Sequence, residues 1–392
     1  MGRTLLSEYN RSVLTERLEF IPERDEEVFA GVPAAPAVFL LRSDDEAAQP
    51  YISKTANLRR RLQRLLGPVE ERTKRLSLRG LVRRIEFTRT SSDFESGFVL
   101  YQTLREVFPK TYVERMRFRF APLVKLHLEN EFPRASVTTR LGKLNGRAVY
   151  YGPFFSRTAA EKFMNDSLDF FKMRRCVDDL HPDPAFPGCI YSDMKMCLAP
   201  CFRGCTDADY ATEVGRVQSY FDSGGDSLVR EVATQRDAAA ERLAFEEAAA
   251  IHVREEKLKT TVGQLPEFVR RIDQWGGLMI QSSQVAQSVA VFQIRGGVIA
   301  GPVLFSTEPP EHTKSRSLEA RLREALDSSP VREPSSALEV MEHLAVLKRW
   351  LYRSHRGGEI FLVDERGELP MRRVVRGIGR VLRGEGPEMG PA

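Results

Sequence analysis

All five cysteines of this 392-residue chain lie between positions 176 and 205, and this clustering limits the possible folds more than any other feature. Cys176, Cys189, Cys197 and Cys201 are separated by twelve, seven and three residues, and Cys205 follows after three more. Four thiolates this close together can surround one soft metal centre, either zinc or an iron–sulfur cluster. The spacing lacks the C-x2-C pairs usual for zinc, which favours iron–sulfur. Reduced thiols packed as small apolar side chains are the alternative.

The rest of the composition indicates a globular protein of two to four modules, with 42% hydrophobic and 29% charged residues. No apolar run approaches the roughly 20 residues that span a bilayer. The N-terminus, MGRTLLSEYNRSVLTERLEF, has no signal-peptide core. We therefore expect a cytoplasmic protein with no membrane partner, in which clustered cysteines bind metal and do not form disulfides.

A basic block between positions 54 and 89 points to a polyanionic partner. The block holds twelve Lys and Arg residues against three Glu, while the whole chain carries a net charge of +5. A localised positive surface is the electrostatic signature of nucleic-acid binding, and a solvated helix face is the alternative. Within the block, Arg59, Arg60 and Arg64 are the candidate DNA contacts. A second set of candidates, equally well explained as a solvated tail, is Arg372, Arg376, Arg380 and Arg383.

The stretch AVFLLRSDDEAAQPYISKTANLRRRL, residues 37–62, predicts a strand, a turn, a second strand and a basic helix. Asn57 is the expected N-cap of that helix, which should end at Gly67-Pro68. A further helix is expected from Ser92 or Asp93 to just before Pro109. This order of elements is typical of a small nuclease.

The cysteine segment RRCVDDLHPDPAFPGCIYSDMKMCLAPCFRGC resembles the UvrC family, the dual-incision subunit of bacterial nucleotide excision repair. The resemblance lies in two cysteines about a dozen residues apart, a following Tyr191 and the C-x-A-P-C ending. It implies a 4Fe–4S cluster whose ligands are Cys176, Cys189, Cys197 and Cys201. Cys205 lies outside the motif, as a spare thiol or an alternate ligand.

Two further segments extend the resemblance. VYYGPFFSRTAAEKF is similar to the family's YFGP strand and the helix after it. ERLAFEEAAAIHVREEKL is similar to the UVR hairpin, which implies docking on the helicase-like protein UvrB through Phe245, Glu246, Ala248 and Ala249. His252 and Val253 replace the usual Arg-Asp, which weakens that implication. From the residues alone, the apolar stripe of this helix is either an intrachain packing face or a partner surface.

Residues 37–62 resemble the GIY-YIG nuclease core, which implies two tyrosines, an arginine and a glutamate around one divalent metal. Tyr51, Lys54 and Arg61 match that pattern, whereas Phe39 replaces the first tyrosine. The alignment also places Leu65 at a further tyrosine and Leu100 at the metal glutamate. Glu95 and Glu106 lie about 140° and 120° around the helix from position 100 and do not substitute. Leucine cannot coordinate magnesium, so we expect an inactive site that holds no Mg²⁺.

Together these patterns predict an α+β multidomain protein, truncated relative to UvrC and lacking its RNase H-like domain. The expected parts are a helical lead-in (1–30), a small GIY-YIG-like mixed sheet with helices (31–110), a Cys-rich iron–sulfur module (111–206), a helical region with a UVR-like hairpin (207–262) and a small α/β region (263–392). The expected role is DNA binding in repair, with UvrB as the partner that the UVR-like hairpin implies. An active single-incision endonuclease and a redox-responsive interaction module are the alternatives.

Overall fold

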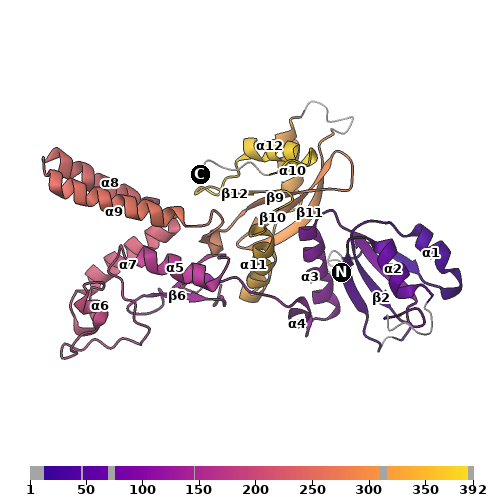
Figure 1. Cartoon of the computed structure of the whole chain (residues 1–392), viewed down its shortest axis with the longest axis horizontal. Helices are drawn as coiled ribbons and strands as arrows, with labels where there is room; N and C mark the ends of the chain where they lie inside the picture. Colours follow the sequence, from indigo (N-terminus) through magenta and orange to yellow (C-terminus); the bar gives the residue numbers. More distant parts are fainter. Residues whose placement is uncertain (1–12, 46, 69–75, 145, 309–315, 387–392) are drawn as a thin grey trace, which may run out of the picture.

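The computed structural model describes residues 13–45, 47–68, 76–144, 146–308 and 316–386. It is a mixed α+β structure with three four-stranded antiparallel sheets. The three sheets lie along an elongated molecule from which one helical hairpin projects (Figure 1). None of the helices in the described ranges combines the length and apolarity that crossing a bilayer requires.

The N-terminal sheet has the strand order β1-β4-β2-β3 and is antiparallel throughout, so the expectation of a mixed sheet was wrong. Its strands are β1 (Glu16–Glu19), β2 (Ala37–Arg42), β3 (Tyr51–Thr55) and β4 (Arg84–Arg89). Strand β1 occupies part of the segment expected as a helical lead-in, of which residues 1–12 lie outside the described ranges. That segment also contributes the turn η1 (Pro22–Arg24) and helix α1 (Asp25–Gly31).

Strand β2 is apolar at almost every position because helices cover both of its faces. Phe39 belongs to a core with α1 and α2 (Leu58–Leu66), whereas Val38 and Leu40 pack against Val99 of α3 (Asp93–Val107). Asn57 caps α2 as expected, since its side chain accepts a hydrogen bond from the Arg60 amide. Ser92 caps α3 in the same way.

Helix α3 has a second apolar face, which packs into the C-terminal part of the chain. Phe94, Phe98 and Tyr101 share a core with Phe292 and Trp350. In Figure 1, α3 lies between the N-terminal sheet and α11 (Ala337–Leu351). The short α4 (Tyr112–Met116) follows α3 on the same side. The core that α3 and α4 share therefore contains residues on both sides of position 110.

The middle sheet has the order β6-β5-β7-β8, and its last strand comes from far along the chain. Its strands are β5 (Leu123–Leu126), β6 (Ala135–Thr138), β7 (Val149–Gly152) and β8 (Arg270–Arg271). Helices α5 (Arg157–Leu168) and α7 (Asp207–Asp222) share its core. Between them lie the cysteine loops, with only α6 (Ile190–Asp193) and η2 (Pro200–Phe202) as regular structure. Helices α8 (Asp226–Glu241) and α9 (Phe245–Gly263) form the projecting hairpin.

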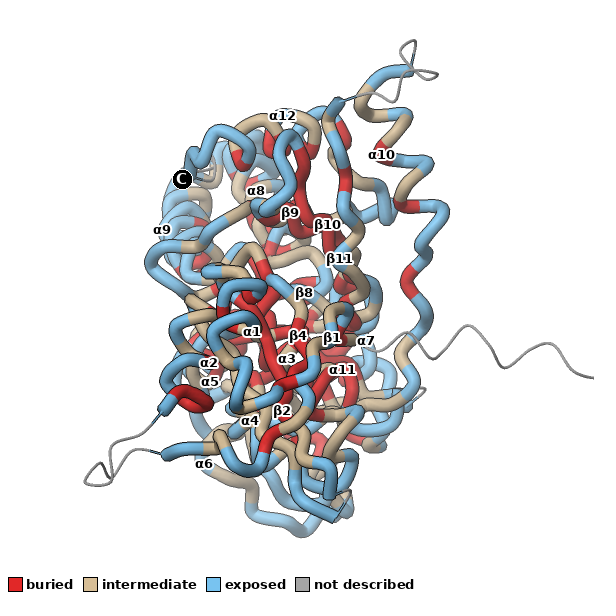
Figure 2. Tube along the Cα trace, turned by 90° about the vertical axis from the view of Figure 1, so that its right-hand side faces the viewer, coloured by how far each residue is buried: buried red, intermediate tan, exposed pale blue. Residues whose placement is uncertain are grey.

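The C-terminal sheet has the order β11-β10-β9-β12 and is enclosed by helices on both faces. Its strands, which follow the turn η3 (Ile272–Gln274), are β9 (Gly277–Ser282), β10 (Ser288–Arg295), β11 (Val298–Ser306) and β12 (Glu359–Leu362). Helices α10 (Leu318–Asp327) and α12 (Met371–Leu382) cover one face, and α11 and α3 cover the other. Figure 2 shows buried residues concentrated along β9 and β10.

Candidate functional site

Tyr51 and Arg61, two of the three retained nuclease residues, are in direct contact. The Nη2 of Arg61 on α2 donates a hydrogen bond to the Tyr51 hydroxyl on β3 at 2.8 Å. The Tyr51 ring lies 6.1 Å from the ring of Phe39, which is fully buried in the apolar core beneath α2. A phenol and a guanidinium thus remain together on this face, while the neighbouring strand supplies only an apolar ring.

Lys54, the third retained residue, does not join them, because side chains alternate between the faces of a strand. Its Nζ forms an ion pair with Asp93 at the start of α3, at 2.5 Å. Asp93 also pairs with Arg353, which follows α11, at 2.6 Å. Burial alone would raise the pKa of Asp93, but the two cations hold that pKa below its ordinary value. Lys54 therefore contributes to a contact between the two ends of the chain.

Leu100 lies on the Lys54 face of the sheet and lines a hollow of about 480 Å³ with Ile52, Lys54 and Phe108. Of the described residues around this hollow, Glu114 supplies the carboxylate. Glu95 points elsewhere: it accepts a hydrogen bond from the Ser91 amide at 2.6 Å, and burial raises its pKa.

The basic residues of α2 have different roles. Arg59 donates to the backbone carbonyls of Val32 and Ala30 at 2.8 and 3.3 Å, which satisfies the end of α1. Arg60 and Arg64 are exposed. Arg79 is likewise bonded internally, to Asp25 and two carbonyls, and Arg72, Lys74 and Arg75 lie outside the described residues. Part of the block is therefore structural, and two arginines of the predicted DNA-contact set remain on the surface.

Some of the C-terminal arginines are likewise bonded internally, and others are exposed. Arg380 makes a two-bond ion pair with the buried carboxylate of Glu359, at 2.6 and 2.7 Å. Arg383 pairs with Glu385 at 2.5 Å. Arg372 and Arg376 are exposed on α12.

The four motif cysteines lie close enough to influence one another. Burial, with a smaller contribution from the thiolates of Cys176, Cys201 and Cys189, raises the pKa of the Cys197 thiol to about 11. The Cys197 sulfur accepts a hydrogen bond from the Ala199 amide at 3.3 Å. Cys205 differs, because it packs against the core of the middle sheet. Across the described ranges, no three His, Cys, Asp or Glu side chains have an arrangement suited to a single metal ion.

Arg174, a residue that the sequence patterns did not single out, anchors the start of the cysteine segment. It is almost completely buried, and its guanidinium donates to the carbonyls of Phe132 and Asp178 at 2.9 and 2.8 Å. The same guanidinium reaches the Cys176 sulfur at 3.5 Å. The only sequence signal was its place two residues before the first cysteine.

The tip of the α8–α9 hairpin exposes apolar side chains. Leu243 and Phe245 are 72% and 67% exposed, and Val253, further along α9, is 69% exposed. Glu246 and Ala249 are also exposed, while Ala248 is half-buried. Ile251, nearer the base, packs against the middle core. The stripe is therefore a packing face at its base and an open surface at its tip.

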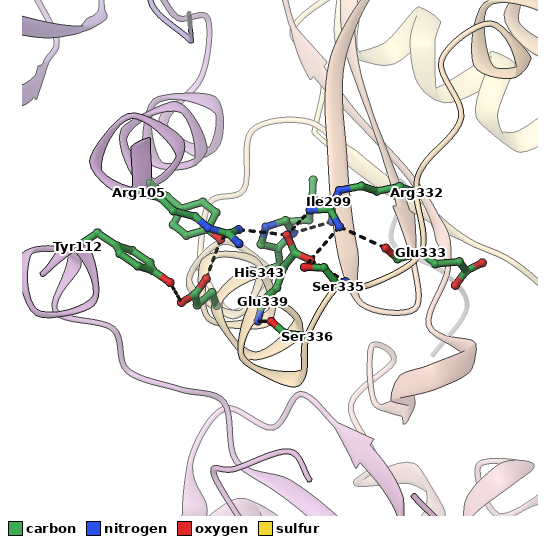
Figure 3. A network of polar contacts seen from close by, with 11 residues as sticks. Arg105, Tyr112, Ile299, Arg332, Glu333, Ser335, Ser336, Glu339 and His343 are labelled. Atoms are coloured by element: carbon green, nitrogen blue, oxygen red, sulfur yellow. Dashed lines mark hydrogen bonds and ion pairs between the residues drawn. The ribbon is translucent and has the colours of Figure 1, made fainter. Parts of the chain in front are cut away.

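A buried polar network connects α3 and α4 to α11 (Figure 3). The hydroxyls of Tyr101 and Tyr112 donate to the Glu342 carboxylate at 2.7 and 2.5 Å. Burial and this carboxylate raise the pKa of Tyr112 to about 12. Arg105 and Arg332 both pair with Glu339, whose pKa is strongly lowered by these cations and by Ser335 despite burial. The network fixes α3 to the C-terminal sheet.

Comparison with known proteins places the middle of the chain in a described family. Residues 122–220 match the model for the UvrC/Cho excinuclease, middle domain. The chain is related to the UvrC proteins. The matched range holds β5–β7 and all five cysteines, so the relationship to UvrC is shown most directly where the cysteine motif lies.

Curated UvrC relatives are similar over longer ranges. The UvrABC system protein C of Rickettsia bellii is 28% identical over 208 residues, covering 52% of this chain and 32% of that protein. Those of Methanothermobacter thermautotrophicus and Moorella thermoacetica are both 26% identical, covering 86% and 87% of this chain and 56% and 55% of theirs. The chain spans about half the length, or less, of these UvrC relatives. No solved structure matches the chain.

Proposed function

We propose that this chain binds DNA in nucleotide excision repair of the UvrC type, and that its N-terminal sheet no longer cuts. The observation that carries the proposal is the divided nuclease face: Tyr51 and Arg61 remain paired, while Lys54 is engaged with Asp93 on the other face. Leu100, which the sequence alignment puts at the metal glutamate, lies among apolar neighbours on the Lys54 face, away from Tyr51 and Arg61. The relationship to UvrC proteins supports the repair context.

The chemistry explains why this arrangement favours holding over cutting. Hydrolysis of a phosphodiester needs a group to accept the proton of the attacking water and a cation to stabilise the developing charge. Magnesium takes hard oxygen ligands, which neither Leu100 nor Phe39 supplies. A tyrosine–arginine pair and exposed arginines such as Arg60 and Arg64 can still contact phosphates.

The test is a plasmid nicking assay with Mg²⁺ on the whole chain, alongside a salt titration of DNA affinity. We expect no incision above background and a salt-dependent affinity that weakens in an Arg60→Gln/Arg64→Gln variant. Incision that disappears in a Tyr51→Phe variant would instead establish the single-cut endonuclease. DNA affinity that does not change with salt concentration would favour the third alternative, a redox-responsive module that interacts with other proteins.

We propose an iron–sulfur cluster as the cofactor, with zinc as the alternative, because four thiols lie within one short segment and thiolates are ligands of both. Cys176, Cys189, Cys197 and Cys201 would hold it, and a 4Fe–4S cluster supplies one-electron redox chemistry when bound. The Ala199 amide and the Arg174 guanidinium would donate hydrogen bonds to two of the sulfurs. Anaerobic purification should give a brown protein containing iron, and Cys197→Ser should lose the colour while Cys205→Ser keeps it. A colourless, zinc-loaded protein would refute the iron assignment.

The exposed hairpin tip is the proposed contact with UvrB. Leu243 and Phe245 provide an apolar anchor and Glu246 a polar flank, the composition expected where one helical arm docks on another protein. A calorimetric titration with UvrB should show binding that Phe245→Asp abolishes. Equal binding by that variant would remove the assignment.

A further inference from the structure

Two adjoining hollows lie where the N-terminal sheet, α4 and the end of α11 meet. The larger, of about 480 Å³, is lined by Lys54, Phe108, Arg115 and Arg117 among others. The smaller is lined by Asp93 of α3 and by Arg349 and Arg353. Lys54 lines both hollows, so they form one continuous surface, which we term the junction surface. This surface is on the opposite side of β3 from the Tyr51–Arg61 pair.

Positive charge dominates the junction surface. Its lining residues include five cations and two carboxylates: Lys54, Arg115, Arg117, Arg349 and Arg353 against Asp93 and Glu114. Such crowding of like charges is costly unless an anion is bound, and it marks a site for a polyanion.

Among the residues that the structure describes, Asp93 pairs with two of these cations at once. Its two oxygens pair with Lys54 and Arg353 at 2.5 and 2.6 Å. All three side chains are partly exposed to solvent. A phosphate could therefore replace Asp93 as the partner of either cation without any change in the core.

Aromatic rings accompany the cations, as they do in proteins that bind unpaired nucleic acid. The Arg115 guanidinium lies 3.7 Å from the centroid of the Phe108 ring. Phe155, just before α5, is 60% exposed, and its ring lies 5.5 Å from that of Tyr352. Tyr352 precedes Arg353 and donates to the Pro153 carbonyl at 2.7 Å, which holds this edge in place. Phe155 thus presents an open ring beside Tyr352, the residue that precedes Arg353 in the chain.

We propose that the junction surface binds the phosphates of a DNA strand with unpaired bases, and that Phe155 stacks on one of those bases. Lys54, Arg115, Arg117, Arg349 and Arg353 contact the backbone, and Asp93 competes with phosphate for two of them. This inference rests on the proposed DNA-binding function and assigns that function to three separate segments of the chain.

The test measures the affinity of the whole chain for a fluorescent oligo-dT strand and for a matched duplex across a range of salt concentrations. Arg349→Gln/Arg353→Gln should weaken single-strand binding and make the slope of log K against log salt shallower by about 1.4, because each phosphate contact to a single strand contributes about 0.7. Asp93→Asn should strengthen binding and steepen the slope. Asp237→Asn on the distant α8 also removes an arginine-paired carboxylate and is the matched control, with no change expected.

Phe155→Ala gives an independent readout. It should weaken oligo-dT binding about tenfold with an unchanged salt slope, and leave duplex binding alone. Fluorescence of the two tryptophans, Trp275 and Trp350, checks that each variant is folded.

The possible outcomes separate a failure of this inference from a failure of the proposed DNA-binding function. If the Arg60→Gln/Arg64→Gln variant weakens DNA binding but no junction variant changes it, the assignment of the junction surface is refuted. The proposed DNA-binding function then still stands. Equal losses for duplex and single strand, with no effect of Phe155→Ala, overturn the assignment to unpaired bases. No binding by the wild type at low salt overturns the proposed function itself.

Discussion

His343 on α11 should make the C-terminal part of the protein less stable in mild acid. The imidazole is buried, and its Nδ1 accepts a hydrogen bond from the Ile299 amide at 2.8 Å, as Figure 3 shows. That bond requires the neutral ring with its proton on Nε2. Burial lowers the pKa of His343 to about 4, with Arg105 and Arg332 also opposing a positive charge and Glu339 favouring it.

The magnitude follows from proton linkage. A histidine in the unfolded chain has a pKa near 6.5, so between about pH 6.5 and pH 4 the unfolded state binds a proton that the folded state does not. Stability is therefore fully present above the unfolded pKa and falls as the pH falls. Between pH 7.5 and pH 5.5, His343 alone should remove about 1.3 kcal/mol from the free energy of unfolding.

The assay is urea unfolding of the wild type and a His343→Asn variant at pH 7.5, 6.5 and 5.5. Asparagine keeps a side-chain acceptor for the Ile299 amide but does not titrate. Both tryptophans of the chain, Trp275 and Trp350, lie in the core next to His343, so their fluorescence reports this region and not the separate middle core. The variant should be less stable at every pH because it loses the ring's contacts with Phe98 and Tyr101.

The decisive quantity is the difference in unfolding free energy between wild type and variant. That difference should shrink by about 1.3 kcal/mol from pH 7.5 to pH 5.5, because only the wild type takes up this proton on unfolding. Other histidines and carboxylates contribute equally to both proteins and cancel. A difference that stays constant over this range would show that the imidazole is solvated or charged in the fold, and would refute the reasoning.

Three further substitutions test the packing that positions the candidate sites. Asn57→Ala should cost about 1 kcal/mol of stability, measured by urea unfolding, because the Arg60 amide loses its cap. Gly377→Ala should destabilise the C-terminal sheet by about 1–3 kcal/mol in the same measurement, since the new Cβ would lie 2.3 Å from the Phe361 ring; a neutral change would contradict the close packing of α12. Phe245→Asp should change stability by less than about 0.5 kcal/mol, because the ring is 67% exposed; a large loss would show that the hairpin tip is packed.

Local signals in the sequence predicted individual elements well. Asn57 and Ser92 each start a helix where a capping residue precedes an amphipathic run, and the helices they cap contain Arg61 and Leu100. The strand pair at residues 37–55 followed from two short apolar runs separated by a polar turn. These features depend on neighbours in the sequence, so composition and spacing are enough to locate them.

Long-range pairing could not be predicted in this way. Strand β1 is polar at three of its four positions and pairs with β4 almost seventy residues later, so it was expected to be part of a helical lead-in. Strand β8 has two residues, Arg270 and Arg271, and nothing in their identity indicates that they complete the middle sheet. The same limit applies to Asp93, whose two partners come from different ends of the chain.

Helix α3 is packed on two sides, and this packing determines where its polar side chains lie. One face of this helix packs Val99 against the N-terminal sheet, while the other sends Tyr101 and Arg105 into a network with Glu339 and Glu342. Helix α3 packs on the Lys54 face of the sheet, whereas Tyr51 packs on the opposite face with α1 and α2, so rotating α3 by 100° per residue would move its buried contacts without bringing an acid to Tyr51. The position of α3 therefore explains why neither Glu95 nor Glu106 lies beside the Tyr51–Arg61 pair.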